Sequence, residues 1–127
     1  MAASENLLFV YGTLRRAGRN PICRMLDHRT DFIGVGTFRG QLYDLGSYPG
    51  VVPSPDAADR VIGEVYALHD PDKAFSILDN YETSEYRREK HPIALEDGRQ
   101  VQAWIYIYVY PTDTLRRIAS GDYLAPE

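Results

Sequence analysis

The stretch Leu7–Arg16, LLFVYGTLRR, decides the fold of this chain. The residues from Leu7 to Tyr11 are apolar or aromatic without a polar interruption, which predicts a short strand that is buried on both faces. Gly12 ends the run, where the backbone turns tightly or lets another group approach closely. The turn after such a strand exposes successive backbone N–H groups, and these bind carboxylates or phosphates. A core strand followed by an ordinary turn explains the same residues, and both interpretations stay open here.

The composition is typical of a globular protein, and we expect a single domain over residues 1–127. The chain of 127 residues is 44% hydrophobic and 25% charged, which suffices for a core. Its net charge of −4 argues against nucleic acid as a partner, because nucleic-acid binding favours a basic patch. The single cysteine, Cys23, supports neither an internal disulfide nor a zinc cluster. The first residues, MAASEN, lack a long apolar stretch, so we expect a cytoplasmic protein with no membrane partner.

Turn and cap signals divide the first half of the chain. Asn20 followed by Pro21 predicts the start of a short helix. Glycines among β-branched and aromatic residues over Phe32–Leu45 predict a bent or bulged strand of a curved sheet or small barrel. The proline-rich stretch Ser47–Asp59 predicts the longest irregular segment.

The second half predicts three strands and a helix. Arg60–His69 alternates as a strand does, and Asp70 followed by Pro71 opens a helix. Tyr86–Leu95 and Val101–Tyr110 flank the hairpin turn EDGR at 96–99. The last strand carries aliphatic residues on one face and aromatic ones on the other, so we expect one face on the core and the other on a cavity or second layer. The aromatic face consists of Trp104, Tyr106, Tyr108 and Tyr110.

A carboxylate occupies the apolar stripe of the helix that begins at Pro71. At about 100° per residue, Glu82 falls on the same arc as Leu78. A carboxylate aimed at the core is costly unless it is paired or has a use. Three interpretations remain: the helix ends before Glu82 and leaves it solvated; Glu82 pairs with Arg87 or Arg88; or desolvation in a pocket raises its pKa towards neutrality and makes it a general base.

Taken together, five blocks of the sequence resemble the γ-glutamylcyclotransferase-like superfamily, and most closely its short γ-glutamylamine cyclotransferase and AIG2-like branch. The resemblance covers 7–123, with the blocks in family order. It implies an α+β fold, a small mixed β-barrel with a few flanking short helices. It also implies release of 5-oxoproline from a small γ-glutamyl substrate, with no metal and no organic cofactor. The blocks are FVYGTLRR from Phe9, GQLYDLGSYPG from Gly40, VIGEVYAL from Val61, ILDNYE from Ile77 and AWIYIYVY from Ala103.

The resemblance also implies the site. It identifies Glu82 as the catalytic glutamate and Tyr106 as a substrate-binding tyrosine of the late strand. The substrate-cradling loop falls on Tyr11, Gly12, Thr13 and Leu14. In the implied reaction, the α-amine of a γ-glutamyl group attacks the side-chain carbonyl of the same group. Glu82 removes a proton from the ammonium and later returns it to the leaving amine. The loop amides hold either the substrate carboxylate or the oxyanion. Many relatives have glycine after the glutamate, whereas this chain has Thr83, so the resemblance implies the carboxylate but not the shape of the pocket beside it.

Two other functions use the same fold. The chain is alternatively a non-catalytic protein that binds a small γ-glutamyl-like ligand, in which case Glu82 is dispensable. A nucleic-acid-binding barrel fits the fold but disagrees with the acidic charge. We expect a monomer or weak dimer, and the sequence does not select the amine that leaves.

Overall fold

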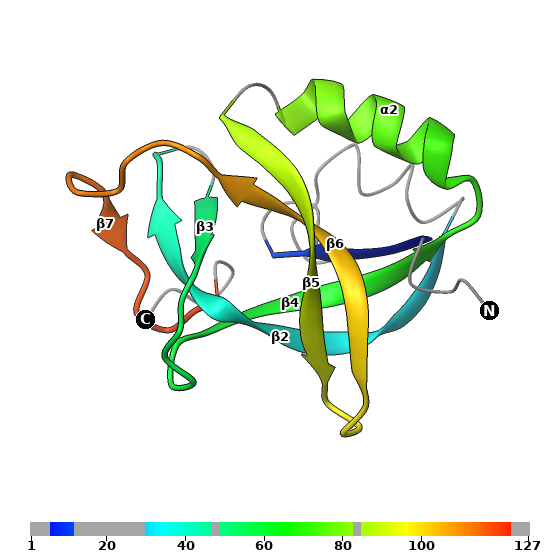
Figure 1. Cartoon of the computed structure of the whole chain (residues 1–127), viewed down its shortest axis with the longest axis horizontal. Helices are drawn as coiled ribbons and strands as arrows, with labels where there is room; N and C mark the ends of the chain where they lie inside the picture. Colours follow the sequence, from blue (N-terminus) through cyan, green and yellow to red (C-terminus); the bar gives the residue numbers. More distant parts are fainter. Residues whose placement is uncertain (1–5, 12–29, 47–48, 83–84, 123–127) are drawn as a thin grey trace.

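A computed structural model describes residues 6–11, 30–46, 49–82 and 85–122, and within 77–82 it describes the backbone alone. The described residues form seven strands and one helix, labelled in Figure 1. The helix that we expect from Pro21 lies outside them. The elements are β1 (Leu7–Val10), β2 (Thr30–Asp44), β3 (Pro49–Pro53), β4 (Arg60–Leu68), α2 (Pro71–Glu82), β5 (Tyr86–Leu95), β6 (Gln100–Tyr108) and β7 (Arg116–Arg117).

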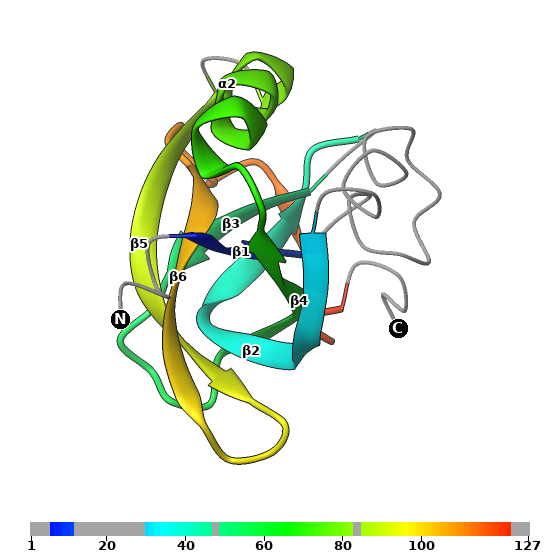
Figure 2. The same ribbon diagram turned by 90° about the vertical axis from the view of Figure 1, so that its right-hand side faces the viewer.

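Five strands close into a mixed barrel, which confirms the predicted fold class. Their order is β2, β4, β1, β6 and β5, and an additional pairing of β5 with β2 closes the ring. Among the described pairs, β1 and β6 run parallel whereas the other pairs are antiparallel. Figure 2 shows the curved β2 wrapping around β1 and β4, with α2 packed above the barrel.

The bent strand predicted over Phe32–Leu45 is confirmed as β2. Its register against β4 shifts between Phe32 and Gly34, which marks a β-bulge, and bulges bend a strand and increase its twist. Further along, Gly36 pairs with Leu95 of β5 at the closure of the barrel. A Cβ atom on Gly36 would lie 2.8 Å from Cγ2 of Ile93. The strands therefore close the ring at a point where a side chain would not fit.

The prediction of an irregular segment over Ser47–Asp59 is wrong for its middle part. Pro49–Pro53 is the strand β3, which pairs antiparallel with the end of β2. Both prolines lie at the ends of this short strand, and β3 is at the edge of the sheet, where proline is tolerated because its missing N–H is not needed by a further neighbour. The proline content of the stretch therefore predicted a loop where the chain forms an edge strand.

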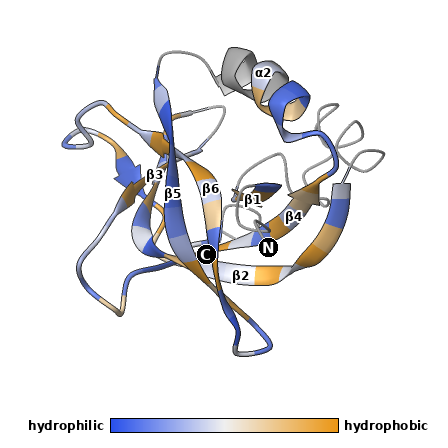
Figure 3. Cartoon of the chain, turned by 45° about the vertical axis from the view of Figure 1, so that its right-hand side comes forward, coloured by the Kyte–Doolittle hydropathy of each residue, from blue (hydrophilic) through white to orange (hydrophobic). Residues whose placement is uncertain are grey.

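Two apolar clusters explain why the first strand is hydrophobic on both faces. Leu7 and Phe9 belong to the barrel interior, whereas Leu8 and Val10 belong to a second cluster on the side of α2. All four side chains are buried, as predicted. In Figure 3 much of β6 and β4 is hydrophobic, whereas β5 is mainly hydrophilic. No helix in the described part of the chain is long and apolar enough to cross a membrane.

Candidate active site

The first and the sixth strands bring their carboxyl ends to the same end of the barrel. Leu8 of β1 pairs in parallel with Trp104 of β6, so two residues later Val10 is level with Tyr106. Beyond these positions β1 has ended and the chain enters the predicted cradle at Gly12. Because the two strands run in the same direction, the end of β1 lies beside Tyr106.

The helix α2 starts at the opposite end of the same strands. It begins as predicted, with Asp70 as the N-cap and Pro71 as the first helical residue. The carboxylate of Asp70 accepts a hydrogen bond from the backbone N–H of Lys73 over 3.3 Å, which satisfies one of the free donors of the first turn. Since β4 is antiparallel to β1, a helix that follows β4 and turns back runs in the direction of β1, as Figure 1 shows.

Phe75 anchors α2 on the barrel. Its ring is buried and packs edge-on against the indole of Trp104, with the two ring centroids 5.9 Å apart. The guanidinium of Arg88 lies 4.0 Å from the centre of the Phe75 ring and 4.8 Å from that of Trp104, which adds cation–π attraction to both contacts. The ammonium of Lys90 also lies over the Trp104 ring, 5.0 Å from its centre. The aromatic face predicted for Val101–Tyr110 thus meets a second layer, which is the helix.

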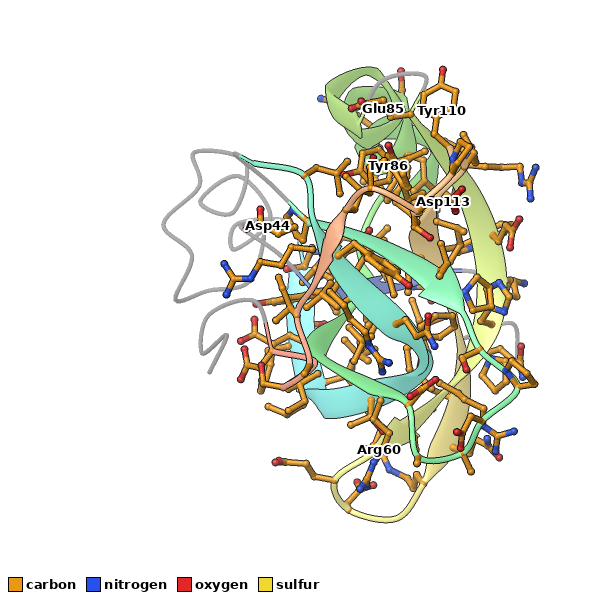
Figure 4. All side chains as sticks on the ribbon, turned by 90° about the vertical axis from the view of Figure 1, so that its left-hand side faces the viewer. Asp44, Arg60, Glu85, Tyr86, Tyr110 and Asp113 are labelled. Carbon is orange, nitrogen blue, oxygen red and sulfur yellow. The ribbon has the colours of Figure 1, made fainter. Side chains whose placement is uncertain are left out.

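The helix ends at Glu82, close to the end of the barrel where β1 and β6 finish. Four residues later, Tyr86 begins β5 and pairs with Tyr108 of β6, and four residues reach at most about 14 Å. The amide of Val109 donates to the carbonyl of Glu85 over 3.0 Å. Figure 4 shows Glu85 and Tyr86 at this end of the molecule, near the helix. The backbone of Glu82 therefore lies near the strand ends that lead into the predicted cradle.

Aromatic contacts hold this end of the barrel together. The ring of Tyr86 packs edge-on against Tyr108, whose ring packs in turn against Tyr110, with centroids 5.9 Å apart in both pairs. The hydroxyl of Tyr86 donates to the backbone carbonyl of Pro49 and so ties β5 to β3. These contacts fix the start of β5 and, through it, the segment that follows α2.

The two tyrosines predicted to bind substrate, Tyr11 and Tyr106, are linked by a hydrogen bond between a side chain and the backbone. Tyr11 belongs to the barrel interior and Tyr106 to the cluster on the side of α2. The hydroxyl of Tyr11 donates to the backbone carbonyl of Tyr106 over 2.7 Å. Tyr11 thereby connects the end of β1 to β6 from inside the barrel. The ring of Tyr106 is buried on the side of the helix, and its role in substrate binding stays a prediction.

The other predicted site residues fall outside the described part of the chain. Gly12, Thr13 and Leu14 are beyond the last described residue after β1, and of Glu82 only the backbone is described. The helix includes Glu82 as its last residue, so it does not end earlier as the first interpretation required. The roles of Glu82 as an ion-pair partner or a base stay predictions. A solvated position of the Glu82 carboxylate also stays untested.

Arg87, one of the two arginines proposed as partners of Glu82, pairs with another carboxylate on β5. Nε of Arg87 donates to Glu89 over 2.6 Å, and Nε2 of His91 lies 2.8 Å from the other oxygen of Glu89. The hydrogen bond with His91, followed by that from Arg87, holds the pKa of Glu89 below its usual value. Arg87 thus belongs to a row of side chains along one face of β5.

Within the described residues, no cluster of three or more His, Cys, Asp or Glu could hold a metal ion.

The structure adds Glu64 and Tyr66, which sequence reasoning did not single out. Glu64 is a carboxylate with only 8% of its surface exposed, on the strand β4. It accepts a hydrogen bond of 2.7 Å from the hydroxyl of Tyr66, whose ring belongs to the cluster under α2. The available signal was the even-numbered face of GEVYAL, on which Glu64 shares a side with Tyr66 and Leu68. Polar residues often alternate with apolar ones in a half-exposed strand, so that signal alone was weak.

Comparison with protein families matches nearly the whole chain. A family model described as "Gamma-glutamyl cyclotransferase, AIG2-like" matches residues 8–125. The gamma-glutamylcyclotransferase family protein YtfP of Escherichia coli (strain K12) is 35% identical over 119 residues, which cover 92% of this chain and 95% of that protein. A putative gamma-glutamylcyclotransferase of Methanocaldococcus jannaschii is 29% identical over 120 residues, covering 91% of this chain and 93% of that protein.

Solved structures have the same architecture. The solution structure of the E. coli protein YtfP superposes with a TM-score of 0.66 at 35% identity, covering 93% of this chain and 96% of that one. The crystal structure of an AIG2-like protein from Mus musculus superposes with a TM-score of 0.71 at 26% identity, covering 87% of this chain and 84% of that one. The barrel fold is therefore shared with a bacterial and a mammalian protein.

Proposed function

Because the chain belongs to the gamma-glutamyl cyclotransferase, AIG2-like family, we propose that it releases 5-oxoproline and a free amine from a small γ-glutamyl compound, with Glu82 as general acid and base. The α-amine of the γ-glutamyl group attacks the side-chain carbonyl carbon, a five-membered lactam forms, and the bond from that carbon to the leaving nitrogen breaks. Both reacting groups belong to one molecule, so orientation within the site supplies much of the acceleration.

Glu82 has two tasks in this proposal. It removes a proton from the α-ammonium, since only the neutral amine is nucleophilic, and later returns that proton to the leaving amine. The backbone N–H groups of Gly12, Thr13 and Leu14 hold an oxygen of the substrate, and Tyr106 lines the site. Tyr11 acts from inside the barrel, where its hydroxyl holds β6 beside the end of β1.

One observation carries the proposal. The helix α2, capped by Asp70 and anchored by Phe75, runs along β1 and ends at Glu82 close to the strand ends that lead to Gly12. A carboxylate at the end of this helix and the amides of that loop come from distant parts of the sequence. They are the two kinds of group that the reaction needs, a base and an anion-binding cradle.

The test is substitution of Glu82. Glu82→Gln keeps the size of the side chain but removes its basicity, so we expect 5-oxoproline formation from a proven γ-glutamyl substrate to fall at least about a hundredfold. Glu85→Gln, which makes the same change three residues later, is the matched control and retains activity near that of the parent. A Glu82→Gln protein that works at the parent rate contradicts the assignment of the base.

The substrate is found by incubating the protein with γ-glutamyl amino acids and γ-glutamylamines and measuring 5-oxoproline. If the parent protein binds members of this panel but forms no 5-oxoproline from any, the chain is a binding protein on the same fold. The Glu82→Gln variant then binds the same compounds with the affinity of the parent, because a dispensable carboxylate contributes nothing to either step.

A further inference from the structure

Two arginines, which we call the arginine pair, lie directly opposite one another on neighbouring strands. Arg39 of β2 pairs with Arg60 of β4, and the next residues along the ladder, Phe38 and Val61, also pair. Phe38 and Val61 belong to the barrel core, so the alternation of the strands puts both arginines on the outer face, where they are exposed. In Figure 4 Arg60 lies at the end of the molecule opposite Glu85, away from the candidate active site.

This arrangement is unfavourable for the folded chain by itself. Like charges directly opposite each other destabilise a sheet, because the Cβ atoms of such residues are only about 4.5–5.5 Å apart. Neither guanidinium makes an ion pair or a hydrogen bond in the part of the chain that the structure describes. The two positive charges are therefore side by side on the surface without a protein carboxylate between them.

The carboxylate nearest in the sequence is already engaged. Asp59 directly precedes Arg60. Its carboxylate accepts hydrogen bonds from Ser54, Gln41 and Arg117 over 2.7, 2.9 and 2.7 Å. The guanidinium of Arg117 also balances the charge of Asp59 in an ion pair. The arginine pair consequently keeps both of its charges for an anion from outside the chain.

The backbone beneath both arginines is held in place. The carbonyl of Arg39 accepts a hydrogen bond of 3.2 Å from the backbone N–H of Ser54. On the other strand, Gly121 has a φ of +72° and lies so close that a Cβ atom on it would overlap the carbonyl oxygen of Arg60. The carbonyl of Gly121 accepts in turn from the N–H of Ile62 over 2.7 Å. Binding an anion here therefore requires ordering of two side chains but not of the backbone.

We propose that the arginine pair binds the phosphate group of a small phosphomonoester. One guanidinium already matches the two oxygens of a carboxylate, whereas two offer a second charge and a second set of donors. A phosphate monoester has a charge of about −1.5 to −2 at neutral pH and three acceptor oxygens, so it accepts from both side chains at once. Its charge replaces the repulsion between the arginines with two attractive contacts. The exposed face leaves room for the organic part of the ligand in solvent. Binding here does not depend on the reaction proposed for the other end of the barrel.

The affinity is measured by NMR titration of the ¹⁵N-labelled full chain with glycerol 3-phosphate at neutral pH, with sodium chloride keeping the ionic strength constant. We expect saturable shifts of the backbone and guanidinium signals of Arg39 and Arg60. Arg39→Gln and Arg60→Gln each remove one of the two charges and should each weaken binding at least about fivefold. Arg116→Gln removes the same charge at an exposed position of β7 and should change the affinity by less than about twofold.

The melting temperature provides a second readout, which a merely structural role would not move in the same way. In chloride alone, Arg39→Gln removes the repulsion and should melt slightly above the parent. At the same ionic strength, glycerol 3-phosphate binds the folded parent and should raise its melting temperature more than that of the variant. The advantage of the variant should therefore shrink or reverse as the ligand is added.

The outcomes separate this site from general ion effects. An equal rise in melting temperature for the parent and Arg39→Gln overturns the proposal, as does equal affinity in the parent and Arg60→Gln. Sodium acetate, a monocarboxylate, should bind at least about fivefold more weakly, and equal binding would overturn the choice of phosphate. Binding of inorganic phosphate but not of the ester would overturn the choice of a phosphomonoester. Both side chains are exposed, so we expect the variants to fold, which circular dichroism checks.

Discussion

The hydroxyl of Tyr11 donates a hydrogen bond of 2.7 Å to the backbone carbonyl of Tyr106, across the parallel pair of strands. Tyr11 and Tyr106 are far apart in the sequence, and the bond is buried inside the barrel. It holds the end of β1 against β6 at the place where the chain leaves for Gly12. The position at which β1 ends therefore depends on an interaction in the core.

Replacing Tyr11 by phenylalanine removes this bond and leaves the ring. We expect Tyr11→Phe to lower the free energy of unfolding by about 1 kcal/mol, the usual net contribution of such a hydrogen bond. Urea denaturation measures the change. Tyr110→Phe makes the same substitution at an exposed side chain and should alter stability by less than about 0.5 kcal/mol. Equal effects in the two variants would show that the buried bond contributes nothing.

Closure of the barrel depends on the absence of a side chain at Gly36. In Gly36→Ala the new Cβ would lie 2.8 Å from Cγ2 of Ile93 and 3.1 Å from the carbonyl oxygen of Ala94. We expect a loss of about 1–3 kcal/mol in the free energy of unfolding, because β2 and β5 have to separate. Gly34→Ala is the control, since its Cβ meets only Cδ2 of Leu95, at 3.9 Å. A Gly36→Ala protein as stable as Gly34→Ala would show that β2 and β5 can accommodate a side chain at Gly36 without loss of stability.

Asp59 makes the stability of the chain dependent on acid pH. Its carboxylate accepts hydrogen bonds from Ser54, Gln41 and Arg117, which lower its pKa from 3.8 to about 2. A lowered pKa means that the unfolded chain binds the proton more readily than the folded one. The stabilisation is therefore present above pH about 4 and lost as the pH falls towards about 2.

Thermal melts over this pH range test the assignment. We expect the melting temperature of the parent to fall more steeply below pH about 4 than that of Asp59→Asn, which has no carboxylate to protonate there. Asp113→Asn changes the charge equally at an exposed position and should keep the slope of the parent. Parallel curves for the parent and Asp59→Asn would show that the hydrogen bonds from Ser54, Gln41 and Arg117 do not favour the folded state.

Phe75 links the stability of the barrel to the position of the proposed base. Truncation in Phe75→Ala removes the contacts with Trp104 and Arg88 and should cost about 3 kcal/mol, within the range for buried aromatic residues. It should also reduce 5-oxoproline formation in the remaining folded protein, because α2 positions Glu82. Ser76→Ala, on the exposed side of the same helix, should change neither measurement appreciably. Normal activity of folded Phe75→Ala would show that the contacts of Phe75 do not position the proposed base.

Local patterns were sufficient for most of the elements. The uninterrupted run of β1 predicted burial on both faces, and Asp70 with Pro71 predicted the start of α2, because each of these signals depends on neighbouring residues. The strand β3 was missed because an edge strand tolerates proline at its ends, so its composition is that of a loop.

The site was harder to predict because it is built from distant segments. The parallel pairing of Leu8 with Trp104 brings the end of β1 to Tyr106, and no local pattern specifies which strands become neighbours. Glu82 was identified by its place in an apolar stripe and by resemblance to a family. Glu64 gave the weaker signal of a polar residue in an alternating strand, and its burial depends on what β1, β2 and the helix place around it.

The parallel pair also has a consequence for how the protein is made on the ribosome. Of the described strands, β1 is the first to be synthesised and lies between β4 and β6, and β6 is the sixth of the seven. Until β6 has emerged, the nascent chain has an apolar N-terminal strand with an unpaired edge, a state that is prone to aggregation. Native contacts of such long range also slow folding. The ends of β1 and β6 therefore come together only after β6 has been synthesised.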